Sequence, residues 1–550
     1  MLKDLFNEEN LYGLNAVLKD IRDGVPAAVF GVDFNKKCAL LAAYDKPFIF
    51  IVNNPEVAKK AVKEINALSG GLAAYLPPKG DMLLFKPVVD KENLFLRLSA
   101  LDDIKSRGLS VVTTMEALLQ PLPLNLPRVV FKKGEEYPLE TAVKNLVYTG
   151  YRRVETVENK GEFSLRGDLM EIYPVNFDDI YRIDFFGDDV ERIKVFGEDK
   201  ELEILAVVSA TDVIFGENEE AKVLDSLKKC VKKFASQEAA KKAMGLYAKL
   251  SEKLENDLSD DSLQYVLPLL KNSTHDFFKA FGGDYAVVLD EPKNLYDLFR
   301  GLIKEHAERV DLLVRGGDGL SFIADAYPTE SEFLTRIKSG RVAAFQSLTT
   351  LIPFFSPLKT YNIAPGAIQK YAFKIDDLIA DAKNWIRGGY TVVIAGGSAA
   401  GAETVYDKLI SGGVNTKYVK EVDGNAFNPV TVSEEYLPSG FIFHECKLVF
   451  IGTDDIFLKS KNSDKSVKKR RGDLFTAPKV GDFAVHENFG VGVVRGVKRI
   501  NTVEGGKDHV ELEYYGGDRL YVATDQMDKL TQYLGGSEAP ALSKIGGGEF

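Results

Sequence analysis

The sequence predicts an α/β protein of several domains: a first α/β module that contains an inserted sheet-rich domain, a further α/β domain, and a small C-terminal β-barrel. Three observations predict this class. Apolar strand-like runs alternate with helical patterns near the N-terminus and again after residue 375. Short strands with tight turns follow residue 128, and glycine-spaced strands follow residue 478. A chain of 550 residues has room for about three to five domains of usual size.

The first α/β part begins with two apolar runs that have the length of buried strands, at residues 26–32 and 47–52. A helical pattern around residues 57–65 separates the second run from a third at 72–76. Strands that alternate with helices at this spacing indicate a parallel sheet.

The middle of the chain changes character twice. Residues 128–196 have short alternating strands, and residues 218–258 are helical in composition and precede a buried strand at 285–289. A helical stripe at 375–386, ended by two glycines, then leads to a strand at 391–394. The last two features predict a second α/β unit.

Between residues 459 and 471 the chain has seven basic residues and almost no apolar ones, which indicates a linker. In the segment that follows, residues 478–534, Val510, Leu512 and Tyr514 share one face of a strand, and Leu520 and Val522 belong to the next. We expect four glycines to mark turns of a small barrel, namely Gly481, Gly490, Gly492 and Gly496.

These patterns divide the chain into seven segments. The first α/β domain comprises 1–122 and 211–345, the sheet-rich domain 123–210, the second α/β domain 346–458, the basic linker 459–477, the barrel 478–541 and a tail 542–550.

Composition excludes several classes of function. The net charge of −11 argues against general binding to nucleic acid or to an anionic membrane, although a local basic patch is compatible with it. Cys38, Cys230 and Cys446 are far apart and the five histidines are scattered, so we expect no metal site and no disulfide framework. No apolar signal or membrane segment is present. We therefore expect a cytoplasmic protein without a metal or cofactor.

A phosphate-binding loop would lie at Gly31–Cys38, after the first strand and before a helix. Such a loop needs glycines, so that backbone N–H groups can surround a phosphate, and a hydroxyl to hold Mg²⁺. Phe34 and Lys36 instead add side chains, and Cys38 replaces the hydroxyl. These residues alone favour an ordinary strand-to-helix turn with a surface lysine.

Three other motifs also have ordinary explanations. Asp290 and Glu291 follow an apolar strand and resemble a Walker-B strand end, but without a phosphate loop a structural role is favoured. The Gly396–Gly401 segment is best explained as a tight connection to a helix, and the basic run Lys468–Arg471 as a solvated linker.

The segment 181–186 carries a more specific signal. If it is a strand, Arg182, Asp184 and Phe186 share one face. An aromatic ring beside an arginine is typical of a protein–protein hot spot. The alternative is that both faces are buried and that Arg182 pairs with Asp184 or Asp188, and the residues alone do not decide between the two.

Two long motifs resemble known repair and transcription domains. Residues 161–174 (GEFSLRGDLMEIYP) and 181–196 (YRIDFFGDDVERIKVF) resemble the domain with which the excision-repair helicase UvrB binds UvrA. That domain also occurs in the bacterial transcription-repair coupling factor (Mfd) family. Residues 481–497 (GDFAVHENFGVGVVRGV) and 509–522 (HVELEYYGGDRLYV) resemble the Tudor-like, CarD-type domain that binds RNA polymerase.

The segment GVDFNKKC aligns in register with the phosphate loop of UvrB, with Gly31 and Lys37 retained and the other glycines and the hydroxyl lost. An eroded UvrB-like module followed by a CarD-type domain is the order found in the coupling factors. The resemblance therefore implies a nucleotide site that no longer functions, at Gly31, Lys37, Cys38, Asp290 and Glu291.

The resemblance also implies docking residues. Arg166, Arg182 and Phe186 would contact UvrA, which favours an exposed face. Ile500, with Arg499 and Lys498 before it, would contact the β subunit of RNA polymerase.

In the intact family an ATP-driven DNA translocase follows the barrel, and no motor motif occurs before Phe550. We therefore expect a monomeric, non-catalytic adaptor without catalytic residues, with weak or no DNA contact, and with an open UvrA-binding face. Two rival interpretations are a UvrB-like helicase, which needs a GK[ST] tripeptide that is absent, and a CarD-like transcription regulator with an unrelated N-terminal half.

Overall fold

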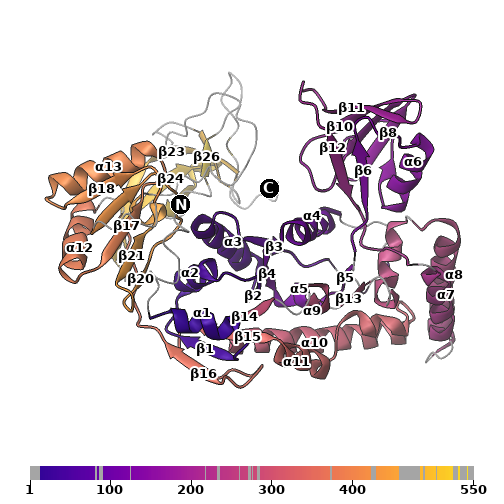
Figure 1. Cartoon of the computed structure of the whole chain (residues 1–550), viewed down its shortest axis with the longest axis horizontal. Helices are drawn as coiled ribbons and strands as arrows, with labels where there is room; N and C mark the ends of the chain where they lie inside the picture. Colours follow the sequence, from indigo (N-terminus) through magenta and orange to yellow (C-terminus); the bar gives the residue numbers. More distant parts are fainter. Residues whose placement is uncertain are drawn as a thin grey trace. The chain divides into compact units, whose positions relative to one another are not determined.

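The computed structural model describes most of the chain and divides it into two compact units, Met1–Lys459 and Ser460–Phe550 (Figure 1). The described residues are 13–80, 83, 85, 91–123, 125–216, 218–231, 236–258, 260–270, 274–275, 277–281, 285–371, 374–422, 429–457, 483–486, 490–502, 505–523, 530–532 and 542.

A parallel seven-stranded sheet forms the centre of the first unit, which confirms the parallel α/β architecture expected for the N-terminal part. Four of its strands, β1 to β4, come before the inserted domain in the sequence. The other three, β14 to β16, come after it. In sheet order the strands are β16 (Lys359–Asn362), β1 (Ala27–Phe30), β15 (Arg341–Gln346), β14 (Ala286–Asp290), β2 (Phe48–Val52), β4 (Ser110–Thr114) and β3 (Ala73–Leu76).

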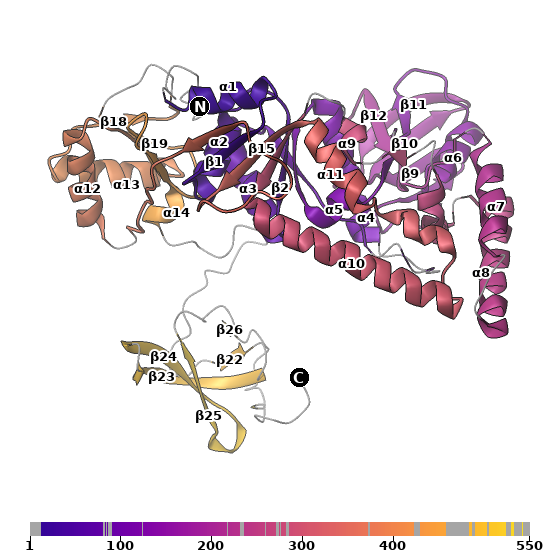
Figure 2. The same ribbon diagram turned by 90° about the horizontal axis from the view of Figure 1, so that it is seen from below.

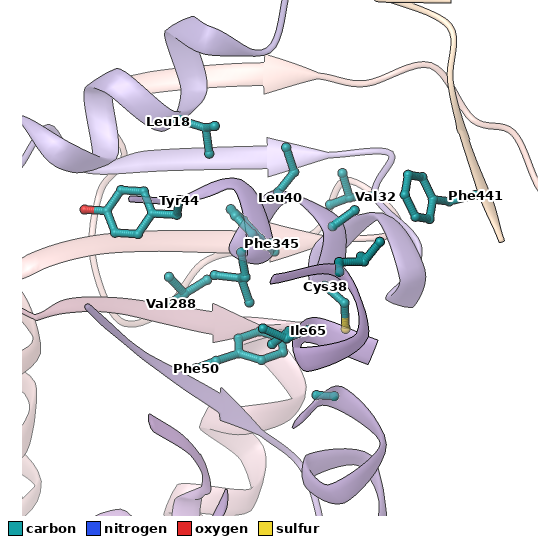
Figure 3. Close-up of a cluster of buried hydrophobic side chains, with 14 of the residues drawn as sticks. Leu18, Val32, Cys38, Leu40, Tyr44, Phe50, Ile65, Val288, Phe345 and Phe441 are labelled. Carbon is teal, nitrogen blue, oxygen red and sulfur yellow. The ribbon is translucent and has the colours of Figure 1, made fainter. Parts of the chain in front are cut away.

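Both faces of this sheet are covered by helices, which explains why its inner strands are continuous apolar runs, whereas the edge strand β16 is polar and mostly exposed. Along β2, Phe48 and Phe50 enter one core cluster, whereas Ile49 and Ile51 enter the cluster on the other face. Figure 3 shows the first cluster, in which Phe50 and Val288 of the sheet lie near Cys38 and Ile65 of the covering helices. The helices around the sheet are α1 (Asn15–Arg22), α2 (Phe34–Ala43), α3 (Pro55–Ser69), α4 (Lys91–Arg107), α5 (Met115–Leu119), α9 (Phe277–Phe281), α10 (Pro292–Gly316) and α11 (Glu330–Ser339).

The inserted region is sheet-rich, as predicted. A five-stranded sheet and a two-stranded sheet contribute to one apolar cluster, together with α6 (Leu139–Tyr148). The larger sheet has the order β11 (Asp189–Val195), β10 (Tyr181–Phe186), β9 (Leu169–Tyr173), β8 (Glu162–Arg166) and β7 (Arg152–Arg153), and the smaller pairs β6 (Arg128–Lys132) with β12 (Ile204–Val208).

A helical part follows, as the composition of residues 218–258 predicts. Helices α7 (Glu219–Cys230) and α8 (Gln237–Asn256) pack with two 3-10 segments, Asp261–Leu269 and Ser321–Ala326, around a separate apolar cluster. The C-terminal half of α10 joins that cluster, so this long helix connects the sheet to the helical pair (Figure 2). A short antiparallel pair joins the segment before the inserted domain to the segment after the helical part. Its strands are β5 (Leu122–Pro123) and β13 (Thr274–His275).

The second α/β unit has its own five-stranded sheet, as predicted. The N-cap of α13 is Ser398, whose hydroxyl accepts from the N–H of Gly401, so the glycine-rich segment is the tight strand-to-helix connection that was expected. The sheet order is β18 (Thr416–Val419), β19 (Val430–Ser433), β17 (Thr391–Ala395), β21 (Leu448–Ile451) and β20 (Phe441–Phe443), with helices α12 (Ile375–Arg387), α13 (Ala399–Ser411) and α14 (Thr453–Ile456).

The C-terminal unit is an antiparallel five-stranded sheet in the described residues, and the predicted barrel is not confirmed. Its order is β25 (Arg519–Ala523), β24 (Gly505–Glu513), β23 (Gly490–Thr502), β22 (Phe483–His486) and β26 (Leu530–Gln532). The shared face of Val510, Leu512 and Tyr514 is confirmed, because all three enter one apolar cluster.

The prediction that glycines mark turns in this unit is wrong for three of the four. Gly490, Gly492 and Gly496 lie within β23, and the strand pairing shifts register beside Gly496. Arg495 has no pairing position there, so Arg495 and Gly496 form a β-bulge, which increases the local twist of the strand. Gly481 and the basic run Lys468–Arg471 lie outside the described residues.

No helix in the described part of the chain combines the length and the apolarity needed to cross a membrane.

Within the first compact unit, the second α/β domain packs directly on the first α/β domain. Phe441, Phe443 and Phe450 enter the same apolar cluster as helices α1 to α3, and Figure 3 shows Phe441 beside Val32. At the edge of this contact Glu64 of α3 is buried. One carboxylate oxygen accepts from the N–H of Ser439 at 3.4 Å, and the other has no hydrogen-bond partner among the described residues. Burial raises the pKa of the Glu64 carboxyl to about 7, an effect that nearby Lys60 partly offsets.

We predict that Glu64 makes stability pH-dependent. Its raised pKa means that the folded state holds a proton that the unfolded state has lost, so the stability that Glu64 contributes falls as pH rises from about 4.5 to 7. Glu64→Gln stays neutral. The free energy of unfolding of this variant, relative to the parent, should therefore rise by on the order of 2 kcal/mol between pH 5 and pH 8.

Urea unfolding at several pH values measures this difference. Glu56→Gln on the exposed side of the same helix is the control and should follow the parent at every pH. A difference between Glu64→Gln and the parent that is the same at pH 5 and pH 8 would contradict the assignment.

Candidate functional site

Strand β10 separates its side chains as the sequence predicts. Tyr181, Ile183 and Phe185 are buried in the apolar cluster of the domain. Phe186, on the opposite face, is 78% exposed. The alternative in which both faces are buried is therefore not what the structure shows.

Two hairpins bring Arg166 and Phe186 to the same end of the sheet. Arg166 is the last residue of β8 and pairs with Leu169 across one tight turn, and Phe186 is the last residue of β10 and pairs with Asp189 across another. Glycines with positive φ, Gly167 and Gly187, form these turns. Since β9 and β10 are also antiparallel neighbours, both turns lie at the same end of the strands. The N–H of Phe185 donates to the carbonyl of Asp168, which joins the two hairpins there.

The guanidinium of Arg166 is oriented by its surroundings. Its Nη2 donates to the carbonyl of Glu155 at 2.7 Å and to the hydroxyl of Thr156 at 3.2 Å. A pocket of about 450 Å³ borders it, lined by Arg153, Val154, Glu155, Leu165 and Arg166. Two arginines on one shallow pocket favour an acidic group of a partner.

Arg182 is exposed only in part, because a neighbouring strand supplies its partner. Its Nη2 donates to the carboxylate of Glu171 on β9 at 2.6 Å. The expected alternative partners were Asp184 and Asp188, and Asp184 instead pairs with Arg192 of β11 at 2.9 Å. The outward face of the sheet thus carries paired charges, and Phe186 is exposed at the end beside the two turns.

The three residues predicted for polymerase contact lie together on β23. Lys498, Arg499 and Ile500 pair with His509, Asp508 and Lys507 of β24. Lys498 is exposed, and its ammonium lies 5.6 Å from the ring centre of Tyr521. The side chains of Arg499 and Ile500 lie outside what the structure describes.

At the nucleotide-site remnant, the prediction of a surface lysine is wrong. Lys37 is 2% exposed. Its ammonium donates to the carboxylate of Asp290 at 2.7 Å and to that of Glu291 at 2.5 Å. The sequence indicated no partner for the acidic pair, whereas the parallel sheet brings the ends of β1 and β14 to one edge, where an ion pair forms.

Glu291 is the centre of this cluster. Its carboxylate oxygen also accepts from the N–H of Ser347 at 2.8 Å and lies 2.8 Å from the Ser347 hydroxyl. Burial acts to raise the pKa of Glu291, but the hydrogen bond and charge of Lys37 and the contact with Ser347 lower it overall. Burial raises the pKa of Asp290, and Lys37 offsets this only in part. One ammonium therefore pairs with two carboxyl groups, of which Asp290 is buried and Glu291 is half-buried.

The remaining loop positions have structural partners of their own. Gly31 has a φ of +78°, and a Cβ there would lie 2.0 Å from the carbonyl oxygen of Ile363, so only glycine fits. Asp33 caps α2 by accepting from the N–H of Lys36 at 3.0 Å, which puts a carboxylate at the helix end where a phosphate would bind. Cys38 is fully buried in the apolar cluster.

Asn35 and Lys36 contact the second α/β unit and the segment that leads to it. The side-chain amide of Asn35 donates to the carbonyl of Gly440 at 3.0 Å. Lys36, fully buried, donates to the carbonyl of Ala364 at 2.8 Å. Asn35 and Lys36 thus hold the two α/β parts together, and sequence analysis did not reveal this because their partners lie more than 300 residues away.

Comparison with known proteins agrees with both docking regions. The UvrB interaction domain family matches residues 129–212, which contain β6 to β12, and the CarD-like/TRCF RID domain family matches residues 479–534. The transcription-repair-coupling factor of Bacillus subtilis (strain 168) is 23% identical over 537 residues, which cover 93% of this chain. Over most of its length the chain is therefore similar in sequence to transcription-repair-coupling factors.

The coupling factor of Staphylococcus epidermidis (strain ATCC 12228 / FDA PCI 1200) is 25% identical over 448 residues, or 77% of this chain. The chain spans 45% of the length of the Bacillus coupling factor and 37% of the Staphylococcus one, less than half in both cases. The two matched domain families are docking domains by name, and they contain the residues on β8, β10 and β23 described above.

We predict that Lys37→Met destabilises the first unit by about 3–5 kcal/mol, because it leaves the buried Asp290 carboxylate and the half-buried Glu291 carboxylate without their counter-ion. The triple variant Lys37→Met/Asp290→Asn/Glu291→Gln should recover most of this loss, since it removes the charges together. Urea unfolding measures both. Lys59→Met on the exposed face of α3 is the control and should change stability by less than about 0.5 kcal/mol.

Because Lys37 is already engaged and Asp33 caps α2, ATP with Mg²⁺ should leave the Tm of the parent unchanged. A triple variant as unstable as Lys37→Met, or a Tm that rises with ATP, would contradict this account of the remnant.

Proposed function

We propose that this chain is a docking adaptor in transcription-coupled nucleotide excision repair, which binds UvrA through its inserted domain and RNA polymerase through its C-terminal unit. The observation that carries the proposal is the outward face of the five-stranded sheet. It presents an oriented arginine and a highly exposed phenylalanine at one end, within the region that matches the UvrB interaction domain.

The UvrA-binding residues in this proposal are Arg166, Arg182 and Phe186. Phe186 offers a ring that loses its water on docking, and burial of a phenylalanine side chain is worth roughly 2–3 kcal/mol. Arg166 is held by Glu155 and Thr156, so little side-chain entropy is lost when it binds a carboxylate. Arg182 pairs with Glu171 on the same face, so removal of the arginine would leave the Glu171 carboxylate without its partner in the proposed contact.

For RNA polymerase, the proposal assigns the contact to Ile500 with Arg499 and Lys498, and names the β subunit as the partner. The match of residues 479–534 to the CarD-like/TRCF RID family supports it. A Tudor-like barrel is part of this proposal, as the closed form of the antiparallel sheet.

The proposal includes no catalytic activity for this chain. The Lys37 ion cluster supports this, because the groups that would bind a phosphate and Mg²⁺ are engaged with one another. The UvrB-like helicase is disfavoured for that reason. We further propose that the adaptor is a cytoplasmic monomer, uses no cofactor, and contacts DNA weakly or not at all, in line with its net charge of −11.

The double variant Arg166→Ala/Phe186→Ala should weaken UvrA binding by about 100-fold or more, because it removes both anchors at one end of the face. Titration with purified UvrA measures the dissociation constant. Val130→Ala, on the outward side of the smaller sheet, is the control and should bind like the parent. A double variant that holds UvrA as tightly as the parent would sink the site assignment.

Ile500→Ala should weaken binding to RNA polymerase, or to its isolated β subunit, by about 10-fold, as expected for the loss of an apolar contact. Arg495→Ala on the same strand is the control, since that arginine is already paired with Glu513 at 3.0 Å. Equal binding by Ile500→Ala and the parent would argue against this residue. Polymerase binding without any UvrA binding would favour a CarD-like regulator instead.

A further inference from the structure

Two phenylalanines stand out by exposure among the described residues. Phe186 is 78% exposed and Phe196 is 51% exposed, and no other described phenylalanine keeps half of its surface in water. Single exposed apolar side chains are ordinary on protein surfaces. These two, however, lie on the same face of one small sheet.

The backbone places Phe196 on the outward face. It directly follows β11, whose Val195 is buried in the core, so the next side chain points outward. The N–H of Phe196 donates to the carbonyl of Ile180 at 2.8 Å, which extends the pairing with β10 by one step. Phe196 thus lies at the end of the face opposite to Phe186.

Arg182 packs on Phe196. The guanidinium carbon lies 5.2 Å from the ring centre, within the range of a cation–π contact. Glu171 fixes the guanidinium from the other side at 2.6 Å, and the Nε of Arg182 is buried without a hydrogen-bond partner in the described part of the chain. These contacts orient the guanidinium of Arg182, and its packing holds the Phe196 ring in place.

A ring that is held before binding loses little entropy on binding, and removal of water strengthens a cation–π contact. Aromatic and arginine side chains also dominate the energy of protein–protein interfaces. The Phe196–Arg182 pair has all of these properties, and the paired charges Asp184 and Arg192 separate it from Phe186.

We propose that Phe196, supported by Arg182, is a second aromatic anchor of the docking face and inserts into an apolar recess on the same partner that covers Phe186. This inference rests on the proposed function, since it names a further contact to UvrA. Phe196 lies opposite Ile180, six residues from Phe186 along the strand direction, so the partner surface must span about 20 Å along β10.

Phe196→Ala should weaken binding to purified UvrA by about 10-fold, measured by titration with the full chain. Ile204→Ala is a matched control, because Ile204 is 53% exposed and lies on the smaller sheet, whose outward face is turned away from the shared core. Phe196→Leu keeps apolar area but removes the aromatic ring, and should lie between the parent and Phe196→Ala. Since the ring is exposed, circular dichroism should show the same fold for all three variants.

A double-mutant cycle tests the pairing. If ring and guanidinium act together, Arg182→Ala/Phe196→Ala should weaken binding by less than the product of the two single effects. Phe196→Ala and Phe196→Leu that both bind like the parent, while Phe186→Ala binds more weakly, would overturn this inference and leave the proposed function standing. Unchanged binding by Arg166→Ala/Phe186→Ala would instead overturn the proposed function, and the inference with it.

Discussion

Lys37 and its two carboxylate partners join three neighbouring strand ends of the seven-stranded sheet. Lys37 comes from the helix after β1, Glu291 from the end of β14, and Ser347 from the end of β15. In parallel α/β sheets this edge is where ligands bind. Here the protein's own ammonium fills it. The apolar clusters on the two faces of the seven-stranded sheet both contain residues of these strands. The packing of this sheet therefore depends on charges that pair with one another inside the protein rather than with a nucleotide.

Residues beside this ion cluster also contact the second α/β domain and the segment that leads to it. Asn35 and Lys36 bind the carbonyls of Gly440 and Ala364, and Phe441 extends the apolar contact. The docking face lies elsewhere, on a sheet with its own core, and needs no contribution from the nucleotide-site remnant. The two regions therefore have separate cores.

Much of this could be predicted from the sequence, because some patterns are local. The apolar runs near residues 26–32 and 47–52 indicate buried parallel strands, and the alternation along 181–186 separates the exposed face from the buried one. Burial of Lys37 could not be predicted, since its partners lie about 250 residues away and a lysine before a cysteine has no local reason to be buried. Phe196 was missed as a site residue for a similar reason, because only the strand pairing places it against Arg182.

The contacts of Asp33, Lys36 and Lys37 bear on whether a phosphate loop could be rebuilt here. Glycines at positions 34 and 36 and a hydroxyl at 38 would recreate the motif of a phosphate loop on paper. They would also remove the Lys36–Ala364 hydrogen bond, leave the Asp33 carboxylate at the helix end, and leave Lys37 bound to its carboxylates. The motif residues alone would therefore not make a phosphate site, because the ion cluster and the helix cap already occupy the positions where a phosphate would bind. Each contact that this loop makes with the rest of the protein makes a phosphate-loop residue a destabilising substitution.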